Sequence, residues 1–362
     1  MYFKNSKQYP VFCLAAGALV LLAGNSVVFA EQDVAAKATE EPAVDTISVT
    51  ATRIERATKD VPFAIDVIDA AQIEGAKMMN IKDAIQGTPG VLIDTKNGGY
   101  DVRLIIRGAG QKANYGVREI MVLRDGVPMT DPDSFSRFDF IDTQDIERIE
   151  ITKGPGSLFG PGSAGGTVQI ISKSVFDTDS NRIKLGFGNY DARNLNLRYG
   201  ADLNDSNAMA LTASRRELKN GWRRWNKFDT TQVGLKHGLL LSDGGTLESE
   251  LSYSQADLRL PGSMSEDQYE EFKDAGKQRE TQDAWKNSGR YSEIVFFNSR
   301  LEKELGEDLL FKPRIYYNHW SQNHPVTGRI NDNKGTGPMY SAPTSSSIMS
   351  IICWVKAPWS PV

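Results

Sequence analysis

The stretch from Thr246 to Ala256 (TLESELSYSQA) alternates apolar and polar side chains with a period of two residues. Successive side chains of a strand point to opposite faces, so Leu247, Leu251 and Tyr253 share one face. The other face carries glutamates and serines, and residues 192–200 alternate in the same way. One face of these predicted strands therefore suits an apolar surrounding, and the other suits water.

Seven segments downstream of residue 174 have this period and are predicted to be antiparallel strands. They span residues 182–188, 192–200, 208–215, 228–241, 246–256, 291–303 and 309–320. A charged face opposite an apolar face is typical of transmembrane β-barrel strands, which have lipid outside and a wet lumen inside.

The connections between these strands alternate in length. Short links at 203–206, 242–245 and 306–308 alternate with long ones at 216–227, at 257–290 and after 321. Tight periplasmic turns and extended external loops produce this alternation in outer-membrane barrels. The short link at 189–191 breaks the rule once, and a soluble sandwich has no reason to show the alternation at all.

Residues 60–174 have the pattern of a separate, compact α+β domain. Asp69 is predicted to begin a helix with Ile73 facing inward, and Asn80 to cap a second helix over 81–86. Asp125-Gly126 is a tight-hairpin signal. Strands are predicted at 61–68, 91–93, 102–106, 120–124, 146–152 and 167–172.

The start of the chain has the three parts of a signal peptide, which we assign to residues 1–30. Residues 31–59 form a flexible leader that is acidic and poor in apolar residues. Within it, residues 45–51 (DTISVTA) are β-branched and have no partner strand following them. The alternative is that they form the first strand of the next domain.

Composition argues against several functions. The net charge of −4 gives no support to nucleic acid as a partner. Two cysteines rule out a disulfide framework, and the three histidines lack metal-ligand spacing, so no metal site is expected. The glycine-rich residues 154–166 lack the Lys-Ser/Thr of a phosphate-binding loop. No nucleophile–base arrangement is found, and we expect no enzyme, no catalytic residue and no cofactor.

Several short motifs follow one another in the α+β domain: Thr88-Pro89-Gly90-Val91, Ile106-Arg107-Gly108, Arg124-Asp125-Gly126-Val127-Pro128, Ile146-Glu147-Arg148-Ile149-Glu150, Gly154-Pro155-Gly156-Ser157, Phe159-Gly160 and Gly165-Gly166-Thr167-Val168. In this order they resemble the plug signatures of the TonB-dependent outer-membrane receptors. Residues 45–51, which precede them, look like the TonB box of that family. The resemblance covers roughly residues 45–330 and implies a plug domain inside a barrel of about 22 strands.

The resemblance also implies partners and site residues. TonB, with ExbB and ExbD behind it, would bind the box by adding a strand. Arg107 and Lys153 would form a latch between plug and barrel, although Lys153 replaces the usual Arg and cannot form a planar bidentate pair. The box comprises Asp45, Thr46, Ile47, Ser48, Val49, Thr50 and Ala51. The ligand-contacting plug loops comprise Lys96, Asn97, Gly98, Gly99, Tyr100, Gly110, Gln111, Lys112, Met129, Thr130 and Asp131.

From this family we expect TonB-dependent transport of a ferric siderophore across the outer membrane of a Gram-negative bacterium, amid lipid and lipopolysaccharide. The ferric chelate would be cargo. The choice of ligand rests on family frequency, and a cobalamin receptor is an alternative. Another alternative is an exported plug that binds ligand or TonB without transport.

The predicted strands over residues 181–338 are too few for a closed barrel. About 22 strands of roughly 10 residues need at least about 220 residues before loops are counted. Residues 339–362 are rich in Ser and Pro and lose the strand alternation. We interpret this tail as the product of a frameshift in a truncated chain, with an internal deletion or a split gene as alternatives.

Overall fold

The computed structural model describes residues 48–49, 56–57, 61, 64–76, 80–96, 101–113, 116–129, 138, 141, 143–155, 162–177, 181–219, 223–278, 283–306, 309–326 and 348–352. The predicted signal peptide and most of the leader lie outside the described residues.

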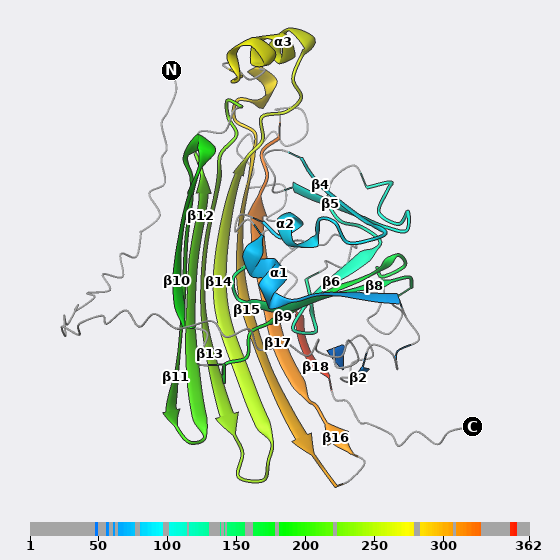
Figure 1. Ribbon diagram of the computed structural model, residues 1–362, viewed down its shortest axis with the longest axis vertical. Helices are drawn as coiled ribbons and strands as arrows, with labels where there is room; N and C mark the ends of the chain where they lie inside the picture. The colour runs from blue at the N-terminus through cyan, green and yellow to red at the C-terminus, as the bar shows by residue number, and fades with distance from the viewer. Residues whose placement is uncertain are drawn as a thin grey trace, which may run out of the picture. The chain divides into compact units, whose positions relative to one another are not determined.

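The N-terminal α+β domain is built on a mixed five-stranded sheet (Figure 1). Its strands, in spatial order, are β3 (Ala64–Ile68), β8 (Ile146–Lys153), β9 (Gly166–Ser172), β6 (Ile120–Arg124) and β7 (Val127–Pro128). The pair β6–β9 is parallel, and the other neighbours are antiparallel. The predicted strands of this domain are present, with ends shifted by a few residues.

Two short helices connect β3 to the next pair of strands. α1 (Ala70–Gly75) begins as predicted, because the Asp69 side chain accepts the N–H of Gln72 at 2.8 Å, and Ile73 is buried. α2 (Lys82–Ile85) does not follow the prediction for Asn80. Its cap is Ile81, and the side chain of Asn80 makes no capping bond.

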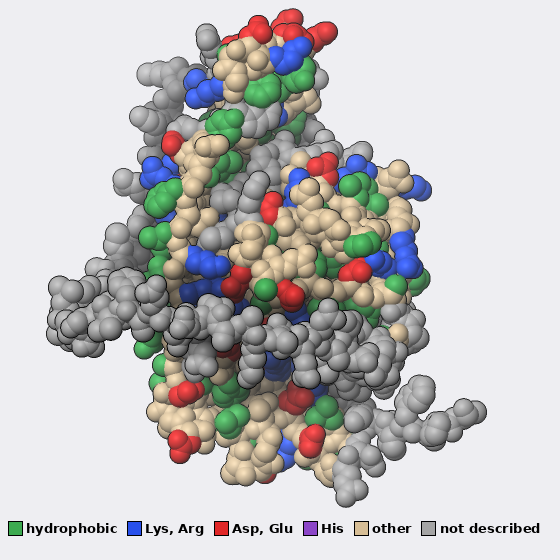
Figure 2. All heavy atoms as spheres, viewed as in Figure 1, with side chains coloured by type: hydrophobic (Ala, Val, Ile, Leu, Met, Phe, Trp, Pro, Cys, Tyr) green, Lys and Arg blue, Asp and Glu red, His purple; other side chains and the backbone are tan. Residues whose placement is uncertain are grey.

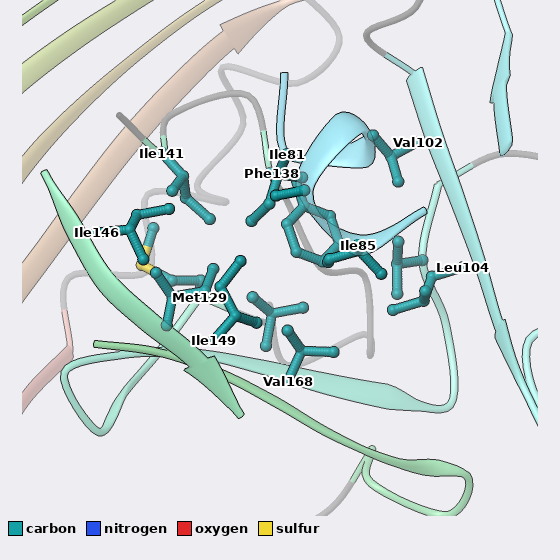
Figure 3. Packing of buried hydrophobic residues seen from close by; sticks show 14 of the residues in the cluster. Ile81, Ile85, Val102, Leu104, Met129, Phe138, Ile141, Ile146, Ile149 and Val168 are labelled. Atoms are coloured by element: carbon teal, nitrogen blue, oxygen red, sulfur yellow. The ribbon is translucent and has the colours of Figure 1, made fainter. Parts of the chain in front are cut away.

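The core of this domain is apolar and continuous. β4 (Val91–Lys96) and β5 (Asp101–Ile106) form a separate antiparallel pair beside α2. Figure 3 shows Ile81 and Ile85 packing toward Leu104, Ile149 and Val168.

The Asp125-Gly126 turn reverses the chain between β6 and β7, as predicted. Both residues have positive φ, 47° and 76°, as a tight turn between antiparallel strands requires. Glycine suits the second position because it carries no Cβ that would clash there.

The downstream strands form one antiparallel sheet with neighbours in chain order (Figure 1). Its strands are β10 (Arg182–Gly188), β11 (Ala192–Asn204), β12 (Asn207–Leu218), β13 (Phe228–Leu240), β14 (Thr246–Arg259), β15 (Gly289–Glu304), β17 (Arg314–Asn323) and β18 (Ile348–Ile352), with β16 (Leu310–Phe311) paired to the end of β15. The α+β domain followed by antiparallel strands confirms the predicted fold class.

The alternation of link lengths is also confirmed. Residues 205–206, 241–245 and 305–309 connect strands at one end of the sheet, whereas 219–227 and 260–288 connect them at the other. The longest link carries α3 (Glu266–Ala275), whose Ser265 and Gln268 form a capping box. Acidic side chains gather over this helix (Figure 2).

The two faces of the strands have opposite character. Apolar side chains are exposed on one face, among them Leu195, Tyr199, Leu211, Val233, Leu235, Leu251, Tyr253, Ile315 and Tyr317. Polar and charged side chains are buried on the other, among them Asn196, Arg198, Thr212, Ser214, Thr230, Gln232, Lys236, Glu250, Ser252 and Asn298. This is the inverse of a water-soluble sheet and suits a lipid-facing surface.

The tail differs from its prediction at one point. Residues 348–352 form β18, which pairs antiparallel with β17 from Ile352 opposite Arg314 to Ile348 opposite Asn318. The other edge of β17 would otherwise present unpaired N–H and C=O groups, and an isoleucine-rich segment supplies a partner. The helices among the described residues are too short or too polar to span a bilayer.

Candidate functional site

The predicted ligand-contacting loops are only partly described. Residues 97–100, Thr130 and Asp131 lie outside the described residues, and for Lys96 only the backbone is described. Gln111 and Lys112 are exposed in a turn, and the Gly110 N–H donates to Glu119 Oε2 at 2.7 Å. These loop positions stay predictions.

Met129 is a correction to that prediction. Its side chain is only 5 % exposed and packs in the core of the α+β domain (Figure 3). The alternation over β7 places Val127 and Met129 inward, so Met129 contributes packing and does not present a ligand contact.

The TonB-box segment is described at two residues, and these are paired. β1 (Ser48–Val49) lies antiparallel to β2 (Arg56–Ala57) in a two-stranded sheet separate from the five-stranded one. The expectation of a segment without a partner strand is therefore wrong at Ser48 and Val49. Two residues per strand make a marginal pairing, because isolated hairpins are barely stable in water.

Arg107 and Lys153 lie together, but the contacts of their side chains are within the α+β domain. Arg107 Nη1 donates to the carbonyl of Lys153 at 3.3 Å, and the Lys153 ammonium pairs with Asp66 on β3. Arg107 is exposed. Their role as a latch to barrel glutamates stays a prediction.

Asp145, the residue before β8, is the centre of a buried charge cluster that joins the domain to the downstream strands. Arg198 Nη1 on β11 lies 2.7 Å from one carboxylate oxygen, and Lys236 Nζ on β13 lies 2.8 Å from the other. All three side chains are less than a tenth exposed. Two cations and one carboxylate thus meet away from solvent, which is tolerated only because each is paired.

A second contact joins β6 to β14 and β15. The Arg124 guanidinium pairs with Glu250 and lies 4.8 Å from the ring centroid of Phe296. Phe296 and Ile294 are buried within the hydrophobic cluster of the α+β domain. The expectation that the inner face of the strands meets water is therefore wrong at these positions of β15, because Ile294 and Phe296 pack against the α+β domain.

Asp125 lies between these two contacts. Its carboxylate accepts the N–H and the hydroxyl of Ser172, at 2.9 and 2.8 Å. Burial alone would raise the pKa of Asp125, but the charges of Lys236, Arg300 and Arg124 and the bond from Ser172 lower it. A cavity of about 20 Å³, enough for about one water, is lined by Asp125, Ser172, Val175, Lys236, Glu248, Ser249, Glu250, Asn298 and Arg300.

A third contact involves α1 and β10. Glu74 accepts hydrogen bonds from Lys173 at 2.8 Å and from Arg182. Burial would raise the pKa of Glu74, but these bonds and charges lower it to about 2. The carboxylate is therefore ionised at neutral pH and holds β10 against the domain.

Sequence reasoning missed these interface residues. Inward charges on predicted strands such as Arg198, Lys236 and Glu250 were visible as the polar face, but nothing local indicates their partners. Among the described residues, no group of three or more His, Cys, Asp or Glu side chains is arranged to hold a metal ion. The cluster pairs anions with cations, and its arrangement can attach one domain to a wall of strands.

The comparisons with known proteins agree with this arrangement. Residues 57–167 match the family model described as the TonB-dependent Receptor Plug Domain. The vitamin B12 transporter BtuB of Vibrio vulnificus is 26 % identical over 269 residues, covering 72 % of this chain and 41 % of that protein. The ferric aerobactin receptor of Klebsiella pneumoniae is 29 % identical over 224 residues, covering 56 % and 28 %. The chain thus spans less than half the length of these curated relatives.

A solved structure shares the fold. The pyoverdine outer-membrane receptor FpvA of Pseudomonas aeruginosa aligns with a TM-score of 0.60 and 18 % identity, covering 77 % of this chain and 40 % of that one.

A plug-type α+β domain seated on strands with a polar inner face and an apolar outer face defines a plugged β-barrel receptor of the outer membrane. Residues 57–167 of the chain carry the plug domain of the TonB-dependent receptors, and the plug with the strands that follow it shares the fold of a solved outer-membrane receptor. These relatives are named as a transporter and a receptor.

Proposed function

We propose that the complete protein imports a scarce, bulky ligand, most simply a ferric siderophore, across the outer membrane of a Gram-negative bacterium. The observation that carries the proposal is the attachment of the plug to the polar inner face of strands whose outer face is apolar. The attachment is made by the buried ion pairs of Asp145 with Arg198 and Lys236. A plug seated in this way closes the lumen, so passage requires energy to rearrange it.

TonB, driven by ExbB and ExbD, is the proposed source of that energy. It would pair with residues 45–51 as an added strand, which uses main-chain hydrogen bonds. Ser48 and Val49 pair with Ala57 and Arg56 along one edge of β1, so TonB would either add to the other edge of β1 or exchange with β2. The exchange is favourable on length alone if TonB pairs with more than two residues.

Two variants separate TonB pairing from the internal pairing. Val49→Pro removes an N–H from the box and should abolish uptake. Ala57→Pro disturbs only the partner strand and should leave uptake intact or raise it. Equal loss in both variants would mean that the β1–β2 pair itself, and not TonB pairing, is required.

The ligand class is tested by growth. A deletion strain complemented with the full-length gene is grown on defined ferric chelates or on cobalamin as the limiting nutrient, with a TonB-deficient strain as control. The aerobactin receptor supports a ferric chelate, and the vitamin B12 transporter, aligned over 269 residues, supports cobalamin as the second candidate. Rescue by cobalamin alone would replace the siderophore in the proposal.

Location distinguishes transport from a soluble plug module. Heat-modifiable protein in the outer-membrane fraction, among lipid and lipopolysaccharide, is expected for the transporter. Recovery of the protein in the soluble periplasmic fraction would contradict it.

A further inference from the structure

The segment that leaves the plug, Lys173–Asp177, fits a socket of small residues on the strands. Val175 is fully buried and packs with Ala208 and Ala210 on β12, with Phe176 beside it. Gly238 on β13 lies opposite Ala208 in the register. A Cβ at Gly238 would lie 2.4 Å from Val175 Cγ1 and 2.6 Å from Phe176 Cζ, so only glycine leaves room for the segment.

Charged side chains from the same wall hold the backbone of this segment. Lys236 Nζ donates to the carbonyl of Lys173 at 2.8 Å. Arg198 Nη2 donates to the carbonyls of Ser174 at 2.7 Å and of Asp177 at 3.3 Å. The same two cations pair with Asp145.

Separating this segment from the wall would therefore be costly in several ways at once. Arg198 and Lys236 would lose the carboxylate of Asp145 while still buried. The backbone carbonyls of Lys173 and Ser174 would lose the hydrogen bonds that they accept from these two side chains. The socket of Ala208, Ala210 and Gly238 would also be emptied of Val175, which creates a void. Apolar fit, charge pairing and backbone bonding coincide here.

We propose that Asp145 and Lys173–Asp177 form a fixed anchor on β11, β12 and β13 that stays closed while ligand passes. Rearrangement then takes place in the remainder of the plug, and the C-terminal end of the plug stays attached to the wall. The part that concerns ligand passage rests on the proposed transport function, whereas the closed anchor does not.

A disulfide across the socket tests the anchor in the full-length protein in outer membranes. Val175→Cys with Ala208→Cys links two buried side chains of the same cluster, and it keeps Gly238, the position where a Cβ would clash with Phe176. We expect the bond to form in air and uptake to stay within about twofold of the reduced sample. The single variants Val175→Cys and Ala208→Cys are the controls, and the probes are radiolabelled ferric aerobactin and radiolabelled cyanocobalamin.

Uptake that falls by more than about tenfold on oxidation and recovers on reduction would overturn the proposal, since the anchor would then have to open. Failure of a folded double variant to form the bond would overturn it as well.

If the double variant does not assemble, limited proteolysis of the wild-type protein tests the anchor in its place. In the wild-type protein, trypsin should not cleave after Lys173, with or without ligand and TonB, and cleavage there during uptake would overturn the proposal. Disulfide formation and protection from trypsin need no ligand. If the complemented deletion strain grows on none of the defined ferric chelates and not on cobalamin while both of these results hold, the transport proposal fails and the closed anchor stands.

Discussion

Asp145 of the plug and Arg198 of β11 form an ion pair with a separation of 2.7 Å, and their side chains are 6 % and 1 % exposed. Such a pair is not by itself a strong source of stability, because both charges lose water. The pair instead makes the position of the plug on the strands specific, because a shifted position would separate the two side chains and leave a buried charge without its partner.

Replacing Asp145 with Asn should loosen the seated plug. Arg198 and Lys236 would face each other without a carboxylate, and breaking a buried pair by removing one partner costs about 3–5 kcal/mol. A lower denaturation midpoint in detergent is the measurement. Glu147→Gln is the matched control, because Glu147 pairs with Arg148 at the surface and should cost about 0–1 kcal/mol. Equal midpoints for the two variants would show that the cluster does not hold the plug.

Two neighbouring phenylalanines on β15 should respond differently to truncation. Phe296→Ala should cost about 3–5 kcal/mol, because Phe296 is buried in the hydrophobic cluster of the plug. Phe297→Ala changes the opposite face, where lipid can fill the space, so the cost should be smaller. Denaturation midpoints and protease sensitivity of the plug measure the difference. A larger effect at Phe297 would mean that the inward face of β15 is assigned wrongly.

Glu74 should make stability depend on pH in the acid range. Its pKa in the folded protein is about 2, below the ordinary 4.5, because Lys173 and Arg182 outweigh burial. A depressed folded pKa gives stability that is fully present above pH 4.5 and is lost as the pH falls through about 2. The melting temperature of Glu74→Gln should therefore be lower than that of the wild type near neutral pH, and the gap should close as the pH approaches 2. A gap of constant size would contradict this assignment.

Leu251 tests the lipid face. It is 54 % exposed on the outer side of β14, so Leu251→Arg should cost about 2–4 kcal/mol if it lies near the middle of the bilayer. Unfolding of the complete protein from lipid vesicles by urea measures the cost, with Leu251→Phe as the apolar control. Similar stability of the two variants would place Leu251 in water.

Local patterns along the chain determined much of this fold. The period of two in residues 246–256, the Asp-Gly turn at 125–126 and the Asp69 cap each follow from neighbours along the chain. Such features depend on backbone geometry and short-range bonding, which is why strands, turn lengths and the two-faced sheet agreed with prediction. The predicted cap at Asn80 failed because Ile81 takes the N-cap position and α2 begins at Lys82, one residue later than predicted.

Packing over long separations decided the remainder. Asp145 and Arg198 are 53 residues apart, and nothing in either neighbourhood selects the other. Met129, Phe296 and Gly238 acquire their roles from surfaces that exist only once the plug lies against the strands. A buried charge or a missing Cβ is defined by what surrounds it in space, and periodicity along one strand cannot supply that.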